Sequence, residues 1–233
     1  MFHPVDHPLK RGWVGRIEGE HVIQLAAQTL QAFFTGGGSA REHAVYPLTG
    51  VRLLTPVLHP PAIRVFDDQR YFCFANPAAI LGPAAVIESG RSTPSDTVSQ
   101  GRLAVLPRLG AIVGVEGTLG GFTAAVDWRR PALGPPKDRD FALALGPVVV
   151  TPDELDPEGL GATVRLDGQE RLRAPFGGFD WEGARAHAAD GTTLRAGDLL
   201  LGAPLELVDG LVPGSTVELD VAGIGVLSQR VAA

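Results

Sequence analysis

The chain has 233 residues, of which 45% are apolar, so it can bury one large core or a main core with a smaller unit beside it. Its formal net charge of −6 provides no basic surface of the kind that binds nucleic acid. No apolar run reaches the ~18 residues of a membrane-spanning helix, and the N-terminus lacks the apolar stretch of a signal peptide, so we expect a cytoplasmic protein without a membrane partner.

Glycine and proline, with 30 and 19 residues, divide the chain into short apolar runs, a pattern typical of strand-rich folds. Residues 12–25 contain two such runs around a Glu-Gly-Glu turn and predict a hairpin. Residues 26–38 have apolar positions at helical spacing before three glycines and predict a helix. A proline-rich stretch over 51–66 predicts the boundary between a small N-terminal unit with its linker, residues 1–60, and a main body, residues 61–233.

The main body alternates predicted strands with turns. The first four predicted strands lie in 70–83, 101–117, 120–128 and 141–151. After them, Thr151 or Asp153 could cap a single helical turn. Alternation over 161–173 around an Asp-Gly pair predicts a hairpin with a type I′ turn, residues 179–190 predict a short helix, and residues 194–231 predict the closing strands. The sequence therefore predicts an α+β fold that is predominantly β.

Asp127 is the first candidate for chemistry, because it ends an apolar run and is followed by Arg129 and Arg130. It could be a metal ligand, an ion-pair partner or a strand terminator. A hard divalent cation needs several oxygen ligands, so one carboxylate does not make a site. The histidines are scattered, Lys137 is expected at the surface, and the single cysteine, Cys73, lies in an apolar run that predicts a buried thiol.

Several segments in order resemble the fumarylacetoacetate hydrolase family. "KDRDFALALGPVVVTPDEL" (137–155) resembles its signature, a lysine, an aspartate three residues later, then Gly-Pro and a strand, and "GGFTAAVDWRR" (120–130) resembles the strand before it. "VRLDGQER" and the closing stretch 194–231 fit the family's turn and last strands. The resemblance covers nearly the whole chain and implies a mixed β-roll or sandwich with a small N-terminal α+β domain.

The resemblance also implies a chemistry. Family members bind Mg²⁺, Mn²⁺ or Ca²⁺ with a Glu-x-Glu on one strand and an Asp on another, and they hydrolyse, decarboxylate or isomerise oxo-acids. Asp127 matches that Asp. Lys137 and Asp140 match the signature and are expected to serve a small anionic oxo-acid, with Arg129, Arg130 and Ala203 as candidate substrate contacts. A homodimer is the assembly expected from the family.

The sequence departs from the family where the cation should bind. The positions that match the Glu-x-Glu are Leu106 and Arg108, so two of the three carboxylates are missing and a positive charge stands near the place of the ion. Such a charge opposes cation binding. We therefore expect Mg²⁺ or Mn²⁺ binding to be weak or absent, and an ion pair between Arg108 and Asp127 to fill the site.

Further departures concern the catalytic groups. After Phe66 the chain lacks the insertion in which family members carry a His and a Glu as an acid–base dyad. Ala203 replaces the threonine of a Gly-Thr-Pro loop, and Phe141 stands where a threonine is common. Two hypotheses follow. The chain is an enzyme that acts on an anionic substrate through its remaining polar groups, or it is an inactive relative that binds a small acid or serves as the partner subunit of an intact paralogue.

Overall fold

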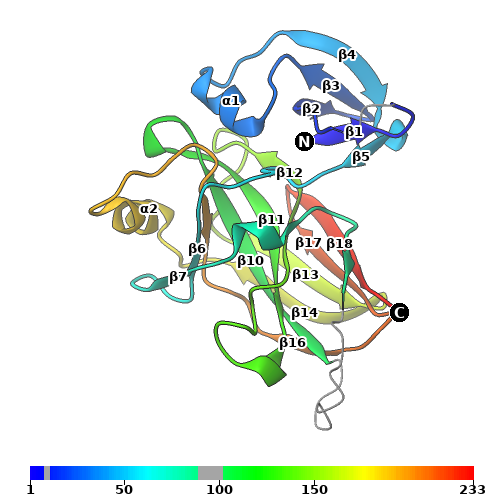
Figure 1. The fold of residues 1–233 in the computed structure, drawn as a ribbon, viewed down its shortest axis with the longest axis vertical. Coiled ribbons are helices and arrows are strands. Elements are labelled where there is room, and N and C mark those ends of the chain that lie inside the picture. Colours follow the sequence, from blue (N-terminus) through cyan, green and yellow to red (C-terminus); the bar gives the residue numbers. More distant parts are fainter. Residues whose placement is uncertain (8–10, 89–101) are drawn as a thin grey trace.

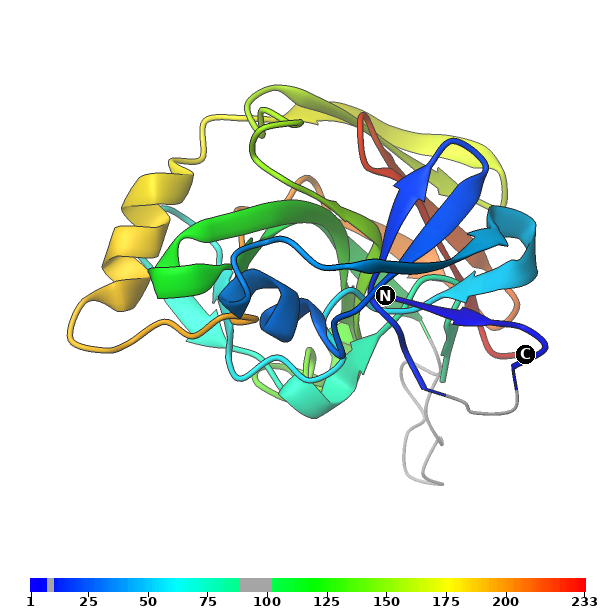
Figure 2. The ribbon, with the colours of Figure 1, turned by 90° about the horizontal axis from the view of Figure 1, so that it is seen from above.

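The computed structural model describes residues 1–7, 11–88 and 102–233. The N-terminal strands and the first helix sit at one end of a larger, strand-rich body, as Figure 1 shows. Viewed from above, helix α2 (Trp181–Ala189) lies at the opposite side of the molecule from the C-terminus (Figure 2). The predominantly β fold predicted from the sequence is confirmed.

The N-terminal unit contains two small sheets. One pairs β1 (Phe2–Pro4) with β5 (Val51–Leu53), and the other has the order β2-β3-β4, with bounds Gly15–Glu18, His21–Leu25 and Glu42–Pro47. The hairpin predicted over 12–25 is confirmed, because β2 and β3 pair across Gly19, whose φ is +55°. Phe2, Trp13 and Val22 form a separate apolar cluster in this unit. The boundary at residue 60 remains a prediction.

Helix α1 (Leu30–Thr35) begins at Thr29, whose hydroxyl accepts a hydrogen bond from the Ala32 N–H, and it is shorter than the predicted helix. Its Phe34 packs on the main body, not on the N-terminal cluster. Short 3₁₀ helices lie at Leu48–Gly50 (η1), Pro77–Ala79 (η2), Val115–Gly117 (η3) and Pro131–Leu133 (η4).

An eight-stranded sheet carries the residues of interest. Its order is β7-β6-β15-β10-β11-β12-β8, and β16 also pairs with β10. The bounds are β6 Ile63–Phe66, β7 Phe72–Phe74, β8 Ile80–Leu81, β10 Leu103–Val113, β11 Leu119–Arg129, β12 Leu143–Val150, β15 Leu199–Leu201 and β16 Val208–Leu211. The single strand predicted over 70–83 is wrong: Asn76 caps η2 and separates β7 from β8. Residue 101, the start of another predicted strand, lies outside the described residues.

A five-stranded sheet packs against the first, in the order β14-β13-β17-β18-β9. Its bounds are β9 Val86–Ile87, β13 Leu160–Leu166, β14 Gln169–Phe176, β17 Thr216–Val221 and β18 Gly225–Val231. The type I′ turn prediction is confirmed, because Asp167 and Gly168 both have positive φ, +51° and +76°. The single helical turn predicted after Thr151 is confirmed: the N–H groups of Glu154 and Leu155 donate to the Thr151 carbonyl at 3.0 and 3.2 Å, and the turn continues into no helix.

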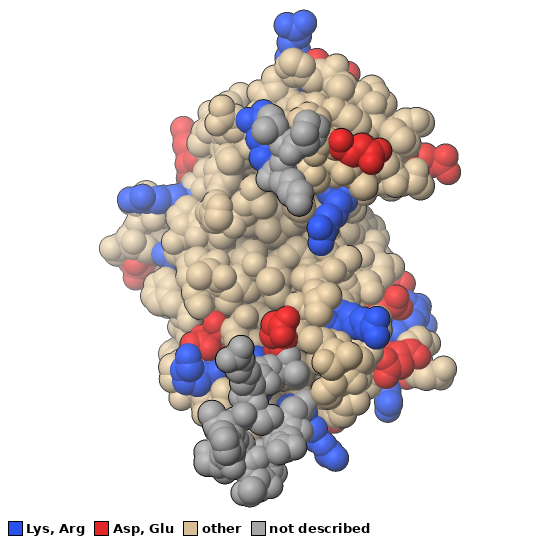
Figure 3. All heavy atoms as spheres, turned by 45° about the vertical axis from the view of Figure 1, so that its right-hand side comes forward, with Lys and Arg blue, Asp and Glu red and all other residues tan. Residues whose placement is uncertain are grey.

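Strand alternation divides the buried side chains of β10 and β11 between two faces. Val105, Leu109, Val126 and Trp128 point into the core between the two sheets. Positions 106, 108, 127 and 129 therefore share the opposite face. Within the described residues, no helix is long and apolar enough to cross a membrane. On the face drawn in Figure 3, acidic and basic side chains are interspersed.

Candidate functional site

The register of β10 on β11 brings the predicted metal positions together. Leu106 lies opposite Asp127, and Arg108 lies opposite Ala125. Residues 106 and 108 are two apart on one strand, so they share a face with Asp127, and each is close enough to meet it. The structure thus places Arg108 where the resemblance expects the second glutamate to face the aspartate.

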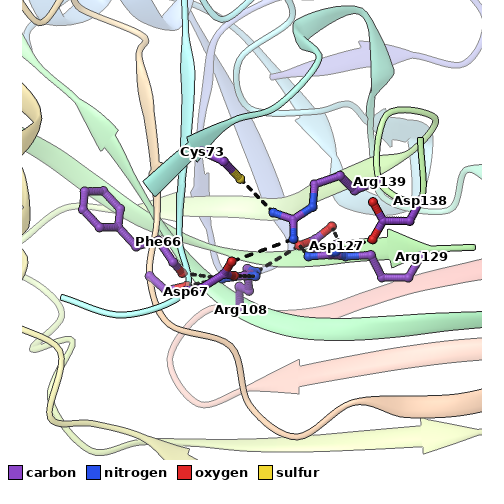
Figure 4. Close-up of polar contacts among 9 residues, drawn as sticks. Phe66, Asp67, Cys73, Arg108, Asp127, Arg129, Asp138 and Arg139 are labelled. Carbon is purple, nitrogen blue, oxygen red and sulfur yellow. Dashed lines mark hydrogen bonds and ion pairs between the residues drawn. The ribbon is translucent and has the colours of Figure 1, made fainter. Parts of the chain in front are cut away.

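The side chain of Arg108 is fully buried, and its guanidinium donates to four oxygens (Figure 4). Nε donates to Asp127 Oδ2 at 3.1 Å, and Nη1 donates to the carbonyls of Phe66 at 2.6 Å and Gly202 at 2.9 Å. Nη2 donates to Asp67 Oδ1 at 2.8 Å. The predicted ion pair between Arg108 and Asp127 is confirmed.

A second arginine also binds Asp127. Arg129, only 7% exposed, donates from Nε to Oδ1 at 3.0 Å and from Nη2 to Oδ2 at 2.8 Å, a two-point contact that fits the planar guanidinium. Its Nη1 donates to Asp138 Oδ2 at 2.8 Å. Asp127 therefore accepts three N–H groups and is 4% exposed. Both of its oxygens are already occupied by donors.

A third arginine closes the network. Arg139 lies 3.8 Å from Asp67 Oδ2 through Nη2 and donates from Nη1 to Cys73 Sγ at 2.8 Å. The thiol of Cys73 is only partly buried and accepts a hydrogen bond from a guanidinium, so the prediction of a buried thiol is wrong. The network consists of three arginines and three aspartates, Arg108, Arg129, Arg139, Asp67, Asp127 and Asp138, and its formal charges cancel.

The electrostatics of the network favour its charged forms. Burial opposes the ionisation of Asp67, but the hydrogen bond and charge of Arg108 outweigh it, with help from the neighbouring guanidiniums, and keep the pKa of Asp67 below its ordinary value of 3.8. Burial likewise disfavours the charged form of Arg129, but the charge and hydrogen bonds of Asp127 and Asp138 raise its pKa.

The segment that supplies Asp67 is a short turn held against α2. The carboxylate of Asp68 accepts the N–H groups of Arg70 and Tyr71 at 2.7 and 3.0 Å. The side-chain amide of Gln69 donates to the Asp180 carbonyl at 2.7 Å and accepts the Asp180 N–H at 3.0 Å. Where the resemblance expects an inserted segment with a catalytic dyad, this chain has a turn that places a carboxylate on Arg108.

The remaining predicted residues do not join the network. Lys137 pairs with Asp140 at 2.5 Å, and their side chains are 68% and 36% exposed. Arg130 follows the end of β11, donates to the Glu88 carbonyl at 2.8 Å and places its guanidinium 3.8 Å from the centre of the Phe141 ring. Burial lowers the pKa of Arg130, which the charge of Asp140 only partly offsets.

Ala203 is half-buried and follows Gly202, the residue whose carbonyl accepts from Arg108. It therefore lies beside the network and presents only a methyl group there. Asp67, Asp138 and Arg139 belong to the network and were missed by the sequence reasoning. Asp138 and Arg139 stand between Lys137 and Asp140 in the signature, so their position next to two predicted residues was the available signal.

A divalent cation does not fit this donor set. The oxygens of Asp127 are held by two buried guanidiniums, and the nearest charge to the expected metal position is positive. Unit charges about 4 Å apart interact by roughly 4 kcal/mol at an effective dielectric constant of about 20, so each guanidinium repels a nearby cation strongly. Among residues 1–7, 11–88 and 102–233, no three His, Cys, Asp or Glu side chains are grouped to hold a metal.

Two concave sites lie elsewhere in the described part of the chain. One has a volume of about 370 Å³ and is lined by the N-terminal unit, including Arg11, Trp13, Gln24 and His43. The other, of about 190 Å³, is lined by Arg171, Leu172 and residues 206–209. Neither includes a residue of the arginine–aspartate network.

Comparison with known proteins relates the whole chain to one fold and residues 120–232 to one family. The sequence profile described as "Fumarylacetoacetate (FAA) hydrolase C-terminal" matches residues 120–232, the part that contains Asp127, Lys137 and Asp140. No curated protein is significantly similar to the chain in sequence.

Solved structures match over nearly the whole chain. A fumarylacetoacetate hydrolase from the psychrophile Exiguobacterium antarcticum is 22% identical, with a TM-score of 0.78 and 96% of each chain covered. The maleylpyruvate hydrolase of Sphingobium sp. SYK-6, in complex with manganese(II) and pyruvate, is 21% identical, with a TM-score of 0.75 and coverage of 95% and 96%. A 2-keto-3-deoxy-D-arabinonate dehydratase complexed with magnesium and 2,5-dioxopentanoate is 18% identical, with a TM-score of 0.75 and 94% of each chain covered. At these identities the likeness shows the fold.

Proposed function

Because this chain belongs to the fumarylacetoacetate hydrolase family through residues 120–232, we propose that it is a member that works without a divalent cation and does not catalyse the family's metal-dependent reaction. One observation carries the proposal: the guanidinium of Arg108, fully buried, binds the aspartate that the family uses as a metal ligand. The formal charges of the network around it cancel, and both oxygens of Asp127 already accept N–H groups.

Two structurally similar proteins illustrate the metal-dependent binding of an oxo-acid that, under this proposal, the present chain lacks. One is described with manganese and pyruvate, another with magnesium and 2,5-dioxopentanoate, so cation and oxo-acid occur together in those proteins. A metal that binds such an acid stabilises the negative charge that develops on its oxygen. In this chain a guanidinium takes the place of the metal, and four of its five N–H groups donate to protein oxygens.

The alternative of a metal-independent enzyme has weaker support. It requires Asp127, Lys137, Arg129 and Arg130 to act on one substrate. Asp127 and Arg129 are buried and paired, whereas Lys137 and Arg130 are bonded to groups outside the network. General acid–base catalysis requires the groups to lie within reach of the same reacting atoms.

We assign the chain the role of a non-catalytic subunit, either in a homodimer or beside an intact paralogue. The edge of the eight-stranded sheet supports this role. Within the described residues, strand β7 (Phe72–Phe74) pairs on one side only, and its Phe74 and the preceding Tyr71 are 66% and 62% exposed. An unpaired strand edge with exposed aromatic side chains is a surface that a second chain can cover.

A second candidate role, binding of a small acid, is favoured by the cavity of about 370 Å³ in the N-terminal unit. Arg11 lines it, with its guanidinium 5.5 Å from the centre of the Trp13 ring, so a planar anion would meet a positive charge and an aromatic wall. Titration of pyruvate into the wild type and Arg11→Ala separates the roles, since only an acid-binding protein gives heat that the substitution removes.

The proposal is tested by metal binding and turnover measured together on chelator-treated protein. We expect no saturable Mn²⁺ or Mg²⁺ binding at or below about 100 µM, a free energy of about −5.5 kcal/mol. We also expect no metal-stimulated hydrolysis of acylpyruvates or decarboxylation of oxaloacetate. Metal-dependent turnover that disappears in Asp127→Asn but persists in Lys137→Ala would show that Asp127 still binds a catalytic cation, and the proposal would be wrong.

A further inference from the structure

The surroundings of the Arg108 guanidinium resemble those of a bound ion. Its N–H groups meet four oxygens from three separate segments: the carboxylates of Asp67 and Asp127 and the carbonyls of Phe66 and Gly202, at 2.6–3.1 Å. Carboxylate and carbonyl oxygens are the donors that Ca²⁺, Mg²⁺ and Mn²⁺ prefer. One of the four, Asp67, comes from a position that the sequence did not mark as a ligand.

We propose that Arg108 is a covalently attached cation inside an oxygen cage formed by Asp67, Asp127 and the carbonyls of Phe66 and Gly202, and that this cage binds a hard divalent cation once the guanidinium is removed. This inference rests on the proposed metal-independence of the wild-type chain. It adds that the loss of metal and the shortened segment after Phe66 are one coupled change, because the turn that replaced the insertion supplies a carboxylate to the arginine.

The walls of the cage are held independently of Arg108. Phe66 is fully buried at the end of β6, and Gly202 donates its own N–H to the Leu109 carbonyl at 2.9 Å. The turn that carries Asp67 is held to α2 by the two hydrogen bonds between Gln69 and Asp180. We therefore expect that shortening the side chain at 108 does not collapse the site, and that the four oxygens continue to face the space that the guanidinium occupied.

The charge count sets the order of affinities. Without Arg108 the cage holds two carboxylates, but Arg129 still binds Asp127 and offsets part of their charge. Arg108→Ala is therefore expected to bind a cation weakly. Arg108→Glu brings a third carboxylate onto the same face of β10 as Asp127, so it is expected to bind more tightly, since affinity for hard cations rises with the number of carboxylate ligands.

The test compares the full-length wild type, Arg108→Ala and Arg108→Glu by thermal unfolding and by electron paramagnetic resonance of free Mn²⁺. Lys137→Glu is the matched control, because it makes the same change of charge on an exposed residue outside the cage. A ligand that binds only the folded state raises its melting temperature. We expect 1 mM Mn²⁺ to raise the melting temperature of Arg108→Glu by about 5 °C or more. The wild type and Lys137→Glu are expected to shift by less than about 1 °C on the same scale.

Adding Asp67→Asn to Arg108→Glu identifies the new ligand. We expect this change to weaken Mn²⁺ binding at least tenfold, because it removes one of three carboxylates from the cage. If Arg108→Glu folds only when Mn²⁺ or Ca²⁺ is present during refolding, that dependence supports the inference equally. If neither Arg108 variant binds the cation, or Arg108→Glu fails to fold with either cation present, the inference is overturned while the proposed function of the wild type stands. Mn²⁺ binding by the wild type would instead overturn the proposed function.

Discussion

Two ion pairs formed by motif residues lie at opposite extremes of exposure. In the pair Arg108–Asp127 the side chains are 0% and 5% exposed, and Nε of the arginine lies 3.1 Å from Oδ2 of the aspartate. In the pair Lys137–Asp140 they are 68% and 36% exposed, and Nζ of the lysine lies 2.5 Å from Oδ2 of the aspartate. The shorter contact is the weaker one, because exposed partners exchange freely with water and salt.

The difference indicates which of the two pairs the stability of the fold depends on. A buried charge that loses its partner has no water to turn to, so Arg108 and Asp127 depend on each other. Lys137 and Asp140 retain the family signature at the surface, where substitution costs little. The signature therefore indicates the family that the chain resembles, whereas the buried site determines whether a cation can bind.

The largest expected effect comes from removing the buried cation. Arg108→Ala takes one buried hydrogen-bond partner from the carboxylate of Asp127 and one from that of Asp67, and we expect the free energy of unfolding to fall by about 3–5 kcal/mol. Urea denaturation in metal-free buffer measures it. A loss below about 1 kcal/mol would mean that the buried pair contributes no more to the free energy of unfolding than an exposed one.

The double replacement Arg108→Met with Asp127→Leu sharpens the comparison. Each single change leaves one buried charge with only its remaining partner, Arg129 for Asp127 or Asp67 for Arg108, whereas the double change removes both charges of the pair. We expect the double variant to be more stable than the sum of the two single effects predicts, by about 1–3 kcal/mol. Denaturation of all four proteins gives the coupling energy, and a value near zero would contradict a direct interaction between the two residues.

A smaller effect is expected from acid. The pKa of Asp67 is lowered in the folded protein, so its ionised form stabilises the fold above its ordinary value of 3.8, and this contribution is lost as the pH falls through the lower folded value. Asp67→Asn removes the titration. We expect the melting temperature of the wild type to fall more steeply below about pH 4 than that of the variant. Parallel curves in the two proteins would show that Asp67 does not contribute.

The smallest effect is expected at the surface pair. Lys137→Ala is expected to change the free energy of unfolding by about 0.2–1 kcal/mol, the range of exposed ion pairs. The effect should shrink in about 0.5 M salt, because exposed charges are screened. If Lys137→Ala destabilised the protein as much as Arg108→Ala, burial would not be the property that separates the two pairs.

Local features of the fold could be predicted from the sequence. The Asp167-Gly168 turn follows from residues that accept positive φ, and the helix at 181–189 begins at Asp180, whose carboxylate caps it. The pairing of Arg108 with Asp127 was also predictable, because the ordered resemblance fixed which residues face the metal position. These features depend on neighbours in sequence or on a known register.

The rest depends on contacts between distant segments. Arg108 meets the carbonyl of Phe66, 42 residues away, and that of Gly202, 94 residues away, and backbone carbonyls carry no signal in the sequence. Asp67 directly follows the point where the family's insertion is missing. Nothing in the neighbouring sequence indicates that its turn folds back onto β10. Cys73 was predicted to be buried because its neighbours in sequence are apolar, but it is only partly buried, and Arg139 contacts it from another segment.

The most direct test of the central claim is a crystal structure of the wild-type protein grown with Mn²⁺, with anomalous diffraction recorded at the manganese absorption edge. We predict no anomalous peak beside Asp127 and a guanidinium of Arg108 within hydrogen-bonding distance of Asp67, Asp127 and the Phe66 carbonyl. A manganese peak on Asp127, with Arg108 turned away from it, would contradict the claim that the arginine holds the cation's place.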